Sequence, residues 1–148
     1  MKTMIEYVKN ELLQREYNIA IDFTMGNGND TLTLSRLAKK VYSFDIQDKA
    51  LENTKKLLND INNVELILDS HDNFDKYVQN FDVGIFNLGY LPQGDHTITT
   101  KVSTTLVAIK KAVQYLNEKG HLFIVVYIGH FEGKEESLKI DEYVSSLD

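Results

Sequence analysis

The sequence reads FTMGNGNDT over residues 23–31, and this stretch decides the fold. An apolar run over residues 19–23 leads into it and predicts a buried strand, while apolar residues at helical spacing follow over residues 32–40. Gly26 and Gly28 let the backbone turn tightly and approach a ligand, because neither carries a Cβ. A strand, a glycine turn and a helix in this order are typical of the first unit of a doubly wound sheet.

The rest of the chain repeats this alternation of strands and helices. Nearly all-apolar strands between helices indicate a parallel sheet that is covered on both faces, so the expected fold class is α/β with a doubly wound, mainly parallel sheet. Further strands are predicted over residues 41–45, 64–68, 82–86 and 121–128, and helices from residue 3 and over residues 50–58, 102–116 and 134–147, with a weak helical turn over 74–78 and Gly120 just beyond the long helix.

Length and composition limit the class of protein. A chain of 148 residues with 43% hydrophobic and 26% charged residues predicts one globular domain over residues 1–148. No Cys is present, which removes disulfides and thiolate metal ligands, so we expect a cytoplasmic protein without a metal site. No apolar stretch approaches the roughly 20 residues of a membrane span. A net charge of −6 disfavours a broad, non-specific grip on nucleic acid but leaves room for a local basic patch.

Ligands of doubly wound sheets bind beyond the carboxyl ends of the strands, so the residues after each strand are the candidates. Asp45 ends the second strand and can accept the hydroxyls of a ribose, or it can cap the next helix. Ser70 and His71 follow the third strand and can bond an adenine edge, or form a turn and a helix cap. The apolar loop NLGYLPQGDH over residues 87–96 positions a substrate or packs on a helix.

These loops together indicate a cofactor that carries a nucleoside. The third glycine of the dinucleotide fingerprint would fall at Thr31 and is missing, which disfavours NAD, and no GxxxxGK[ST] phosphate loop is present. S-adenosylmethionine (SAM) fits better, because it has no pyrophosphate for the third glycine to accommodate. The alternative for the glycine turn is a purely structural connection between strand and helix.

Five segments of the sequence together resemble one family. They read FTMGNGNDT (residues 23–31), DIQ (45–47), DSH (69–71), NLGYLP (87–92) and YIGH (127–130). They resemble the rRNA-methylase family of SAM-dependent methyltransferases, which is associated with the wobble uridine of tRNA. The resemblance implies a class I, Rossmann-like methyltransferase that methylates the amine of 5-aminomethyl-2-thiouridine, giving 5-methylaminomethyl-2-thiouridine. The implied partner is the tRNA anticodon loop, and the acidic charge suggests that a second subunit, as in a homodimer, helps to grip the RNA.

The resemblance also implies roles for individual residues. Asn87 and Tyr90 stand where related amino-methyltransferases carry an Asn-Pro-Pro-Tyr-type motif, although Leu88 and Gly89 replace the prolines here. Cofactor contacts are expected from Thr24, Gly26, Asn27, Gly28, Asn29, Asp30, Thr31, Asp45, Ile46, Gln47, Ser70, His71 and Asn87. Catalytic roles are expected for Asn87 and Tyr90, with His96 and His130 as candidate proton acceptors, and substrate contacts from Gly89, Tyr90 and His130.

Class I methyltransferases normally end with a sixth strand and an antiparallel seventh, whereas this sequence ends in a helical pattern. We therefore expect a sheet in which the last two strands are missing or truncated, and a domain that is incomplete at its C-terminus. Two other functions fit the same residues: a SAM methyltransferase acting on rRNA, protein or another amine, and a SAM-binding module without catalysis.

Overall fold

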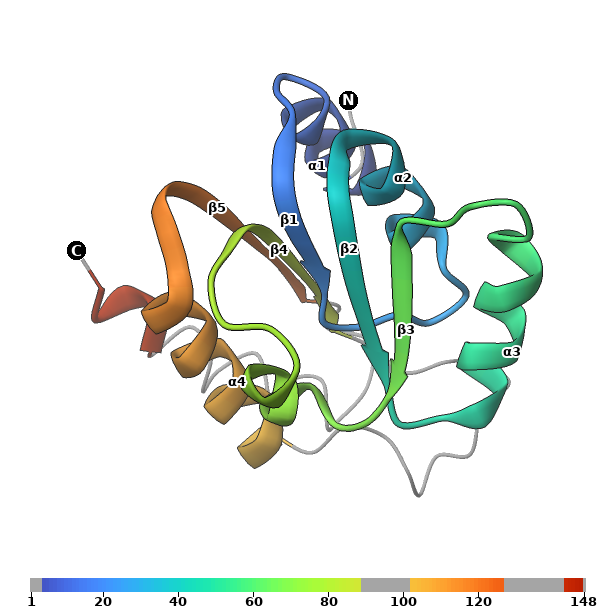
Figure 1. Cartoon of the computed structure of the whole chain (residues 1–148). Coiled ribbons are helices and arrows are strands. Elements are labelled where there is room, and N and C mark those ends of the chain that lie inside the picture. Colours follow the sequence, from blue (N-terminus) through green and yellow to red (C-terminus); the bar gives the residue numbers. More distant parts are fainter. Residues whose placement is uncertain (1–3, 89–101, 127–142, 148) are drawn as a thin grey trace.

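A parallel sheet forms the centre of the protein in the computed structural model, which describes residues 4–88, 102–126 and 143–147 (Figure 1). Five strands in these residues take the order β3-β2-β1-β4-β5, and every neighbouring pair is parallel. The strands are β1 (Tyr17–Asp22), β2 (Ala38–Asp45), β3 (Val64–Leu68), β4 (Phe81–Leu88) and β5 (Leu116–Val126). The strand order reverses between β1 and β4, so the predicted doubly wound fold is confirmed.

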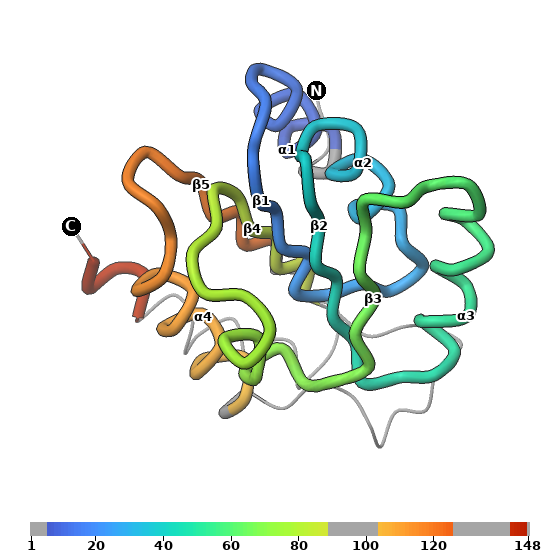
Figure 2. Tube along the Cα trace, viewed as in Figure 1, coloured from blue at the N-terminus to red at the C-terminus, as the bar shows by residue number. Residues whose placement is uncertain are grey.

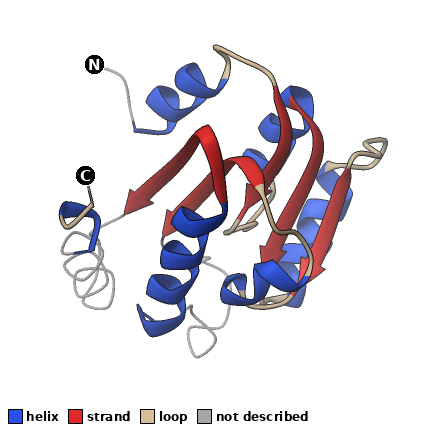
Figure 3. Cartoon of the chain, turned by 60° about the vertical axis from the view of Figure 1, so that its left-hand side comes forward, coloured by secondary structure: helices blue, strands red, loops and turns tan. Residues whose placement is uncertain are grey.

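Helices cover both faces of the sheet (Figures 1 and 3). They are α1 (Met4–Leu12), α2 (Asn29–Leu37), α3 (Asp48–Leu57), the 3₁₀ helix η1 (His71–Lys76) and α4 (Val102–Tyr115). One apolar cluster packs α1 and α2 against the sheet, through Leu12 and Leu34. A second cluster packs η1 and α4 against the opposite face, through Phe74 and Ile109. The chain path in Figure 2 shows α3 beside β3, on the flank of the sheet away from α4.

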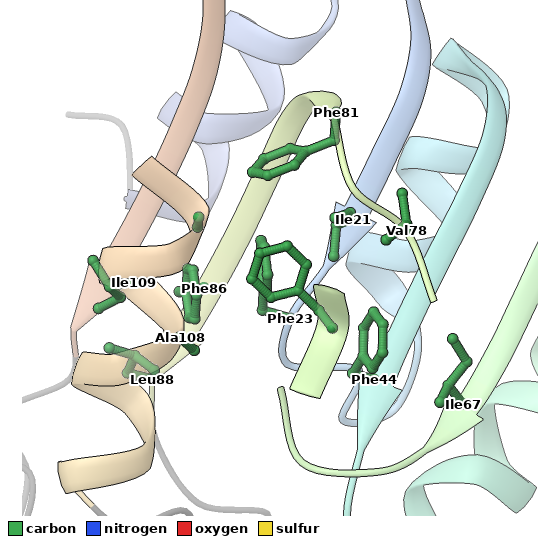
Figure 4. Close-up of a cluster of buried hydrophobic side chains, with 12 residues drawn as sticks. Ile21, Phe23, Phe44, Ile67, Val78, Phe81, Phe86, Leu88, Ala108 and Ile109 are labelled. Atoms are coloured by element: carbon green, nitrogen blue, oxygen red, sulfur yellow. The ribbon is translucent and has the colours of Figure 1, made fainter. Parts of the chain in front are cut away.

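Five phenylalanines belong to the second cluster, and Figure 4 labels Phe23, Phe44, Phe81 and Phe86 among them. The ring of Phe23 stacks on that of Phe86 with centroids 4.2 Å apart, and it meets Phe74 and Phe81 edge-on at 5.1 and 5.8 Å. Such aromatic pairs contribute ~0.5–1.5 kcal/mol each beyond the burial of their area. Because Phe23 directly precedes the glycine turn, this packing fixes the point at which the turn leaves the sheet.

Several predicted element boundaries are wrong, among them the start of the last strand, which is Leu116 and not residue 121. The helix predicted over residues 32–40 ends at Leu37, because Ala38 and Val41 are buried in strand β2 instead. The helix predicted over 102–116 ends at Tyr115, and Gly120 does not stop it. Gly120 lies in β5, where a Cβ would come within 2.8 Å of the Asp82 carbonyl oxygen. A Cβ would also lie 2.7 Å from Leu116 Cδ1 and 2.8 Å from the Asn117 carbonyl oxygen, so contacts within β5 and with β4 together explain this glycine, while Lys119 carries the positive φ of 68°.

The other predicted elements are placed as follows. The strands predicted over 41–45, 64–68 and 82–86 are confirmed inside β2, β3 and β4. Residues 127–128 of the last predicted strand, and most of the helix predicted over 134–147, lie outside the described residues. Among the described residues, β3 and β5 form the two edges of the sheet.

Candidate functional site

The glycine turn connects β1 to α2 at the carboxyl end of the sheet. Gly26 and Gly28 have φ angles of 55° and 89°, in the left-handed region that L side chains rarely adopt. The Met25 N–H donates to the Phe44 carbonyl at 2.9 Å, and the Gly26 N–H donates to Oδ2 of Asp45 at 3.1 Å. The end of β2 therefore holds the turn in place, and Asp45 lies beside its backbone.

Helix α3 supports the turn from a second side. The Thr54 hydroxyl, which is fully buried, donates to the Gly26 carbonyl at 3.3 Å, and Asn53 Nδ2 donates to Asn27 Oδ1 at 3.1 Å. A Cβ on Gly28 would lie 2.8 Å from the Thr54 side chain, whereas a Cβ on Gly26 would meet only the Thr24 carbonyl, at 3.9 Å. The turn thus packs tightly against α3 at Gly28, whereas at Gly26 it has no such close contact among the described residues. This leaves room for a ligand beside the Gly26 backbone.

This asymmetry gives a matched pair of variants. Gly28→Ala is expected to lower the free energy of unfolding by about 2–4 kcal/mol, because left-handed strain adds to a clash with Thr54. Gly26→Ala carries the strain alone and should cost about 1–2 kcal/mol. Urea unfolding measures both. Equal losses in the two variants would contradict the packing of Thr54 below the turn.

A buried carboxylate that the sequence did not single out lies under the turn. Asp22, the last residue of β1, has no exposed surface and accepts the Thr24 N–H at 3.1 Å and the Thr31 hydroxyl at 2.7 Å. The Thr31 hydroxyl also contacts the Ser43 hydroxyl at 2.8 Å, so Thr31 is a fully buried part of this network. Burial, followed by the charge of Asp30, raises the pKa of Asp22 to about 7. An acid at the end of an otherwise apolar strand was the signal that could have found it.

Asn87 joins β4 to this network across the switch point of the sheet. Its backbone N–H donates to the Thr24 hydroxyl at 2.7 Å, and its side-chain Nδ2 donates to Asp30 Oδ2 at 3.3 Å. Residues from β1, α2 and β4 thus meet at one point. The two predicted site residues Asp30 and Asn87, which lie 57 positions apart in the sequence, are brought into contact.

Asp45 and the two residues after it form the ribose side of the candidate site. Asp45 Oδ1 accepts the Gln47 N–H at 2.9 Å, and burial raises the pKa of the Asp45 carboxyl. Ile46 is 38% exposed and presents apolar surface at this edge, while the Gln47 side chain is buried. Asp45 therefore anchors the start of α3 and the glycine turn together, and each of its oxygens keeps a further lone pair for a ligand.

Ser70 and His71, the two residues after β3 that are predicted to contact the adenine, have different hydrogen-bond partners. The Ser70 hydroxyl donates to Asp72 Oδ1 at the start of η1. His71 is buried, its Nδ1 lies 3.0 Å from the Phe23 carbonyl, and its Nε2 lies 3.3 Å from the Thr105 hydroxyl on α4. Because a carbonyl only accepts, Nδ1 carries the proton and Nε2 accepts from Thr105. Burial lowers the pKa of His71, so the neutral ring links β1, η1 and α4.

The remaining predicted residues fall outside this cluster. Asn29 begins α2, and its carbonyl accepts the Thr33 hydroxyl at 3.2 Å. Gly89, Tyr90, His96 and His130 lie outside the described residues. The described part of the chain holds no group of three or more His, Asp or Glu side chains that could bind a metal ion. In the same residues, no helix is both long enough and apolar enough to cross a membrane.

A cleft of about 550 Å³ opens at the other end of the sheet. It is lined by the amino ends of β1 and β2 and by charged side chains that include Arg15, Arg36 and Asp82. Asp82 accepts the backbone N–H groups of Asn18 and Ile19, at 3.1 and 2.9 Å. This cleft is separate from the candidate site, because the amino ends of parallel strands lie at one end of the sheet and their carboxyl ends at the other.

Comparisons with known proteins place the chain in a family. Residues 41–148 match the Putative rRNA methylase family. The chain is 36% identical to the chloroplastic tRNA (mnm(5)s(2)U34)-methyltransferase of Arabidopsis thaliana, over 98% of this chain and 59% of that protein. The chain thus spans less than two thirds of this curated relative.

Solved structures are similar along the whole chain. A putative methyltransferase from Streptococcus mutans, in complex with S-adenosylhomocysteine (SAH), is 46% identical with a TM-score of 0.92. A putative rRNA-methylase from Clostridium thermocellum is 39% identical with a TM-score of 0.93. In both comparisons the alignment covers 100% of this chain and 84% of the other.

The parallel sheet, its switch point and the glycine turn define a class I, Rossmann-like methyltransferase domain, whose cofactor is SAM. The open backbone over Gly26 and the acid at Asp45 fit that cofactor, because they leave space for its tail and offer acceptors for its ribose. Within this class, the chain belongs to the Putative rRNA methylase family.

Proposed function

We propose that this chain transfers a methyl group from SAM to the exocyclic amine of 5-aminomethyl-(2-thio)uridine at the wobble position of tRNA, giving 5-methylaminomethyl-(2-thio)uridine. The supporting observation is the position of Asn87, which lies near the carboxyl end of β4 and contacts both the glycine turn and α2. An amide there can accept an N–H of an amine. The function named for the Arabidopsis relative supports the choice of amine.

Each loop has one part of the cofactor to hold in this proposal. The backbone of Gly26, Asn27 and Gly28 receives the methionine tail, Asp45 accepts the ribose hydroxyls, and Ile46 packs on the adenine. Ser70 lies where it can meet the adenine edge. For His71 the protein already occupies both ring nitrogens, so we assign it to holding η1 and α4 behind the base.

When bound, SAM supplies a methyl group on a sulfonium. An uncharged amine attacks this methyl group directly, and the sulfur leaves as SAH. The protein therefore mainly has to align two reactants, and alignment of this kind can contribute ~7–11 kcal/mol. Proton transfer by a general base contributes less, ~10²–10⁴ in rate. We assign Asn87 to the alignment, Tyr90 to stacking on the splayed wobble base, Gly89 to close approach of that base, and His96 or His130 to the released proton.

The proposed partner is the anticodon loop of tRNA. A chain with a net charge of −6 gains little from general attraction to phosphate, so a second copy of the chain is proposed to contribute to the RNA surface. The proposed localisation is the cytoplasm, because a chain without Cys fits a reducing compartment.

The test uses the purified protein, isotope-labelled SAM and two tRNA preparations, one with and one without the 5-aminomethyl group. Mass spectrometry of the digested nucleosides is expected to show labelled 5-methylaminomethyl-uridine only with the first preparation. Ribosomal RNA is the comparison substrate, since the family description names it. Labelled rRNA with unlabelled tRNA would replace this proposal with an rRNA methyltransferase, and SAM binding without transfer to either would indicate a non-catalytic module.

A further inference from the structure

Among the described residues, the Asn87 side chain is contacted at its Nδ2 atom and not at its amide oxygen. Its Nδ2 donates to Asp30 Oδ2 at 3.3 Å, and its backbone N–H is fixed by the Thr24 hydroxyl at 2.7 Å. No donor from the described part of the chain contacts the Asn87 amide oxygen. An ionised carboxylate can only accept, so the amide must turn its NH₂ toward Asp30 and its oxygen away from it.

We propose that Asp30 is a positioning residue for methyl transfer, and that it acts by orienting the Asn87 amide. This inference rests on the proposed function and adds to it the residue that sets the polarity of the amine site. An asparagine amide can rotate by half a turn and exchange donor for acceptor at the same place. The contact with Asp30 removes that freedom, so that the Asn87 oxygen faces the incoming amine.

The chemistry of the step explains why this polarity matters. When an amine N–H is donated to the Asn87 oxygen, the nitrogen lone pair is left to point elsewhere, toward the methyl group. That lone pair forms the new N–C bond while the C–S bond breaks, which leaves SAH and a secondary ammonium. The ammonium then releases one proton, for which His96 and His130 are the proposed acceptors. An amide in the reverse orientation would present N–H to the amine and would draw the lone pair away from the methyl group.

The surroundings of Asp30 favour this role over that of its neighbour Asp22. Asp22 is fully buried, and its oxygens accept Thr24 and Thr31. Asp30 is half-buried in the first turn of α2, where the N-terminus of the helix stabilises a negative charge. Asp22 thus stabilises the glycine turn from its buried side, and Asp30 is the carboxylate that contacts Asn87 of β4.

Three variants separate orientation from charge. Asp30→Ala removes the acceptor, and kcat for the aminomethyl tRNA is expected to fall at least about tenfold, with the Kd for SAH within about twofold of the wild type. Asp30→Asn keeps an acceptor oxygen for Asn87 and should restore kcat to within about threefold. The double variant Asp30→Ala with Asn87→Ala should be no slower than Asn87→Ala alone, because both changes remove one interaction. Asp48→Ala, an exposed acid in the first turn of α3, is the matched control.

Other outcomes overturn the inference. Equal losses in Asp30→Ala and Asp30→Asn would mean that the residue acts through its charge, and a large rise in the Kd for SAH with normal kcat would make it a cofactor ligand. The side-chain NH₂ signals of Asn87 in a ¹⁵N NMR spectrum provide a readout independent of turnover. They should shift in Asp30→Ala and stay in place in Asp48→Ala. If the wild type ignores the aminomethyl tRNA, the proposed function fails, while these signals still decide whether Asp30 orients Asn87.

Discussion

Asp22→Asn is expected to raise the free energy of unfolding at pH 8 by as much as about 4 kcal/mol. The pKa of Asp22 is about 7 in the folded protein, against an ordinary value of 3.8, and each pKa unit corresponds to about 1.4 kcal/mol. The cost arises because folding buries a carboxyl that is charged in the unfolded chain at this pH. An asparagine carries no charge to bury, so this cost disappears.

The hydrogen bonds of Asp22 can survive the substitution. The new amide oxygen can accept the Thr24 N–H, and its NH₂ can donate to the Thr31 hydroxyl, which then donates to Ser43. The second N–H of the new amide has no partner among the described residues, so the penalty of ~1–3 kcal/mol for an unsatisfied buried group reduces the gain.

The effect depends on pH in a defined direction. Between pH 3.8 and about 7 the folded protein holds a proton on Asp22 that the unfolded chain has released. The stability of the wild type should therefore fall, relative to Asp22→Asn, as the pH rises through this window, and the difference should be constant above it. The lowered pKa of His71 is common to both proteins, whereas the repulsion by Asp30 and Asp45, which adds to the raised pKa of Asp22, is absent in the variant. Urea unfolding at intervals from pH 4 to pH 8 measures the difference.

Asp82→Asn is the control with the opposite sign. Burial acts to raise the pKa of Asp82, but hydrogen bonds from Ile19, Asn117 and Asn18 outweigh it, and the pKa is lowered. This variant should lose stability at pH 8, where Asp22→Asn gains it. Parallel stability curves for the wild type and Asp22→Asn between pH 4 and pH 8 would show that Asp22 is charged in the folded protein throughout.

The sequence was sufficient for the sheet because its strands are nearly all apolar and its turns carry glycine. The ends of elements were less predictable where packing overrides a local pattern. Gly120 had the position of a helix stop, but it lies in β5, where a Cβ would meet Leu116 and Asn117 nearby in the sequence and Asp82, 38 residues earlier. The contact with Asp82 leaves no local signal.

The candidate site likewise contains residues that the sequence predicts and residues that carry no local signal. The glycine turn, Asp45 and Asn87 follow from their positions after strands, whereas Thr54 and Asn53 support the turn from the middle of α3 and carry no motif. Thr31 and His71 belong to the predicted motifs, but their side chains are buried and form hydrogen bonds within the protein. A polar side chain next to a loop can stabilise the loop instead of binding a ligand. Sequence position therefore identifies the loop more reliably than the direction of each side chain.

Asp45→Ala is expected to weaken SAM binding at least tenfold, or by about 1.4 kcal/mol. The carboxylate accepts the Gly26 N–H at 3.1 Å and the Gln47 N–H at 2.9 Å, and its remaining lone pairs are proposed to accept the ribose hydroxyls. Hydrogen bonds to a charged group contribute ~1.5–3 kcal/mol each. The variant thus loses direct acceptors and loosens the turn over which the cofactor lies.

Asp45→Asn should rescue little of this loss, in contrast to the rescue expected at Asp30. Both oxygens of Asp45 face backbone N–H donors, so an asparagine would turn its NH₂ against either Gly26 or Gln47. Asp48→Ala, three residues further on and exposed, is the matched control and should bind SAM as the wild type does. Calorimetric titration with SAM, together with a circular dichroism spectrum for each variant, gives affinity and fold in the same experiment.

The pH dependence of binding supplies an independent check on Asp45. Burial raises the pKa of its carboxyl, so protonation should begin at a higher pH than for an exposed aspartate. The affinity of the wild type for SAM should therefore decline as the pH falls through this raised pKa. The affinity of Asp45→Ala, which is weaker, should not show the decline that protonation of Asp45 causes. If the folded Asp45→Ala protein binds SAM with wild-type affinity, the carboxylate only anchors Gly26 and the start of α3, and the ribose must be held by other groups.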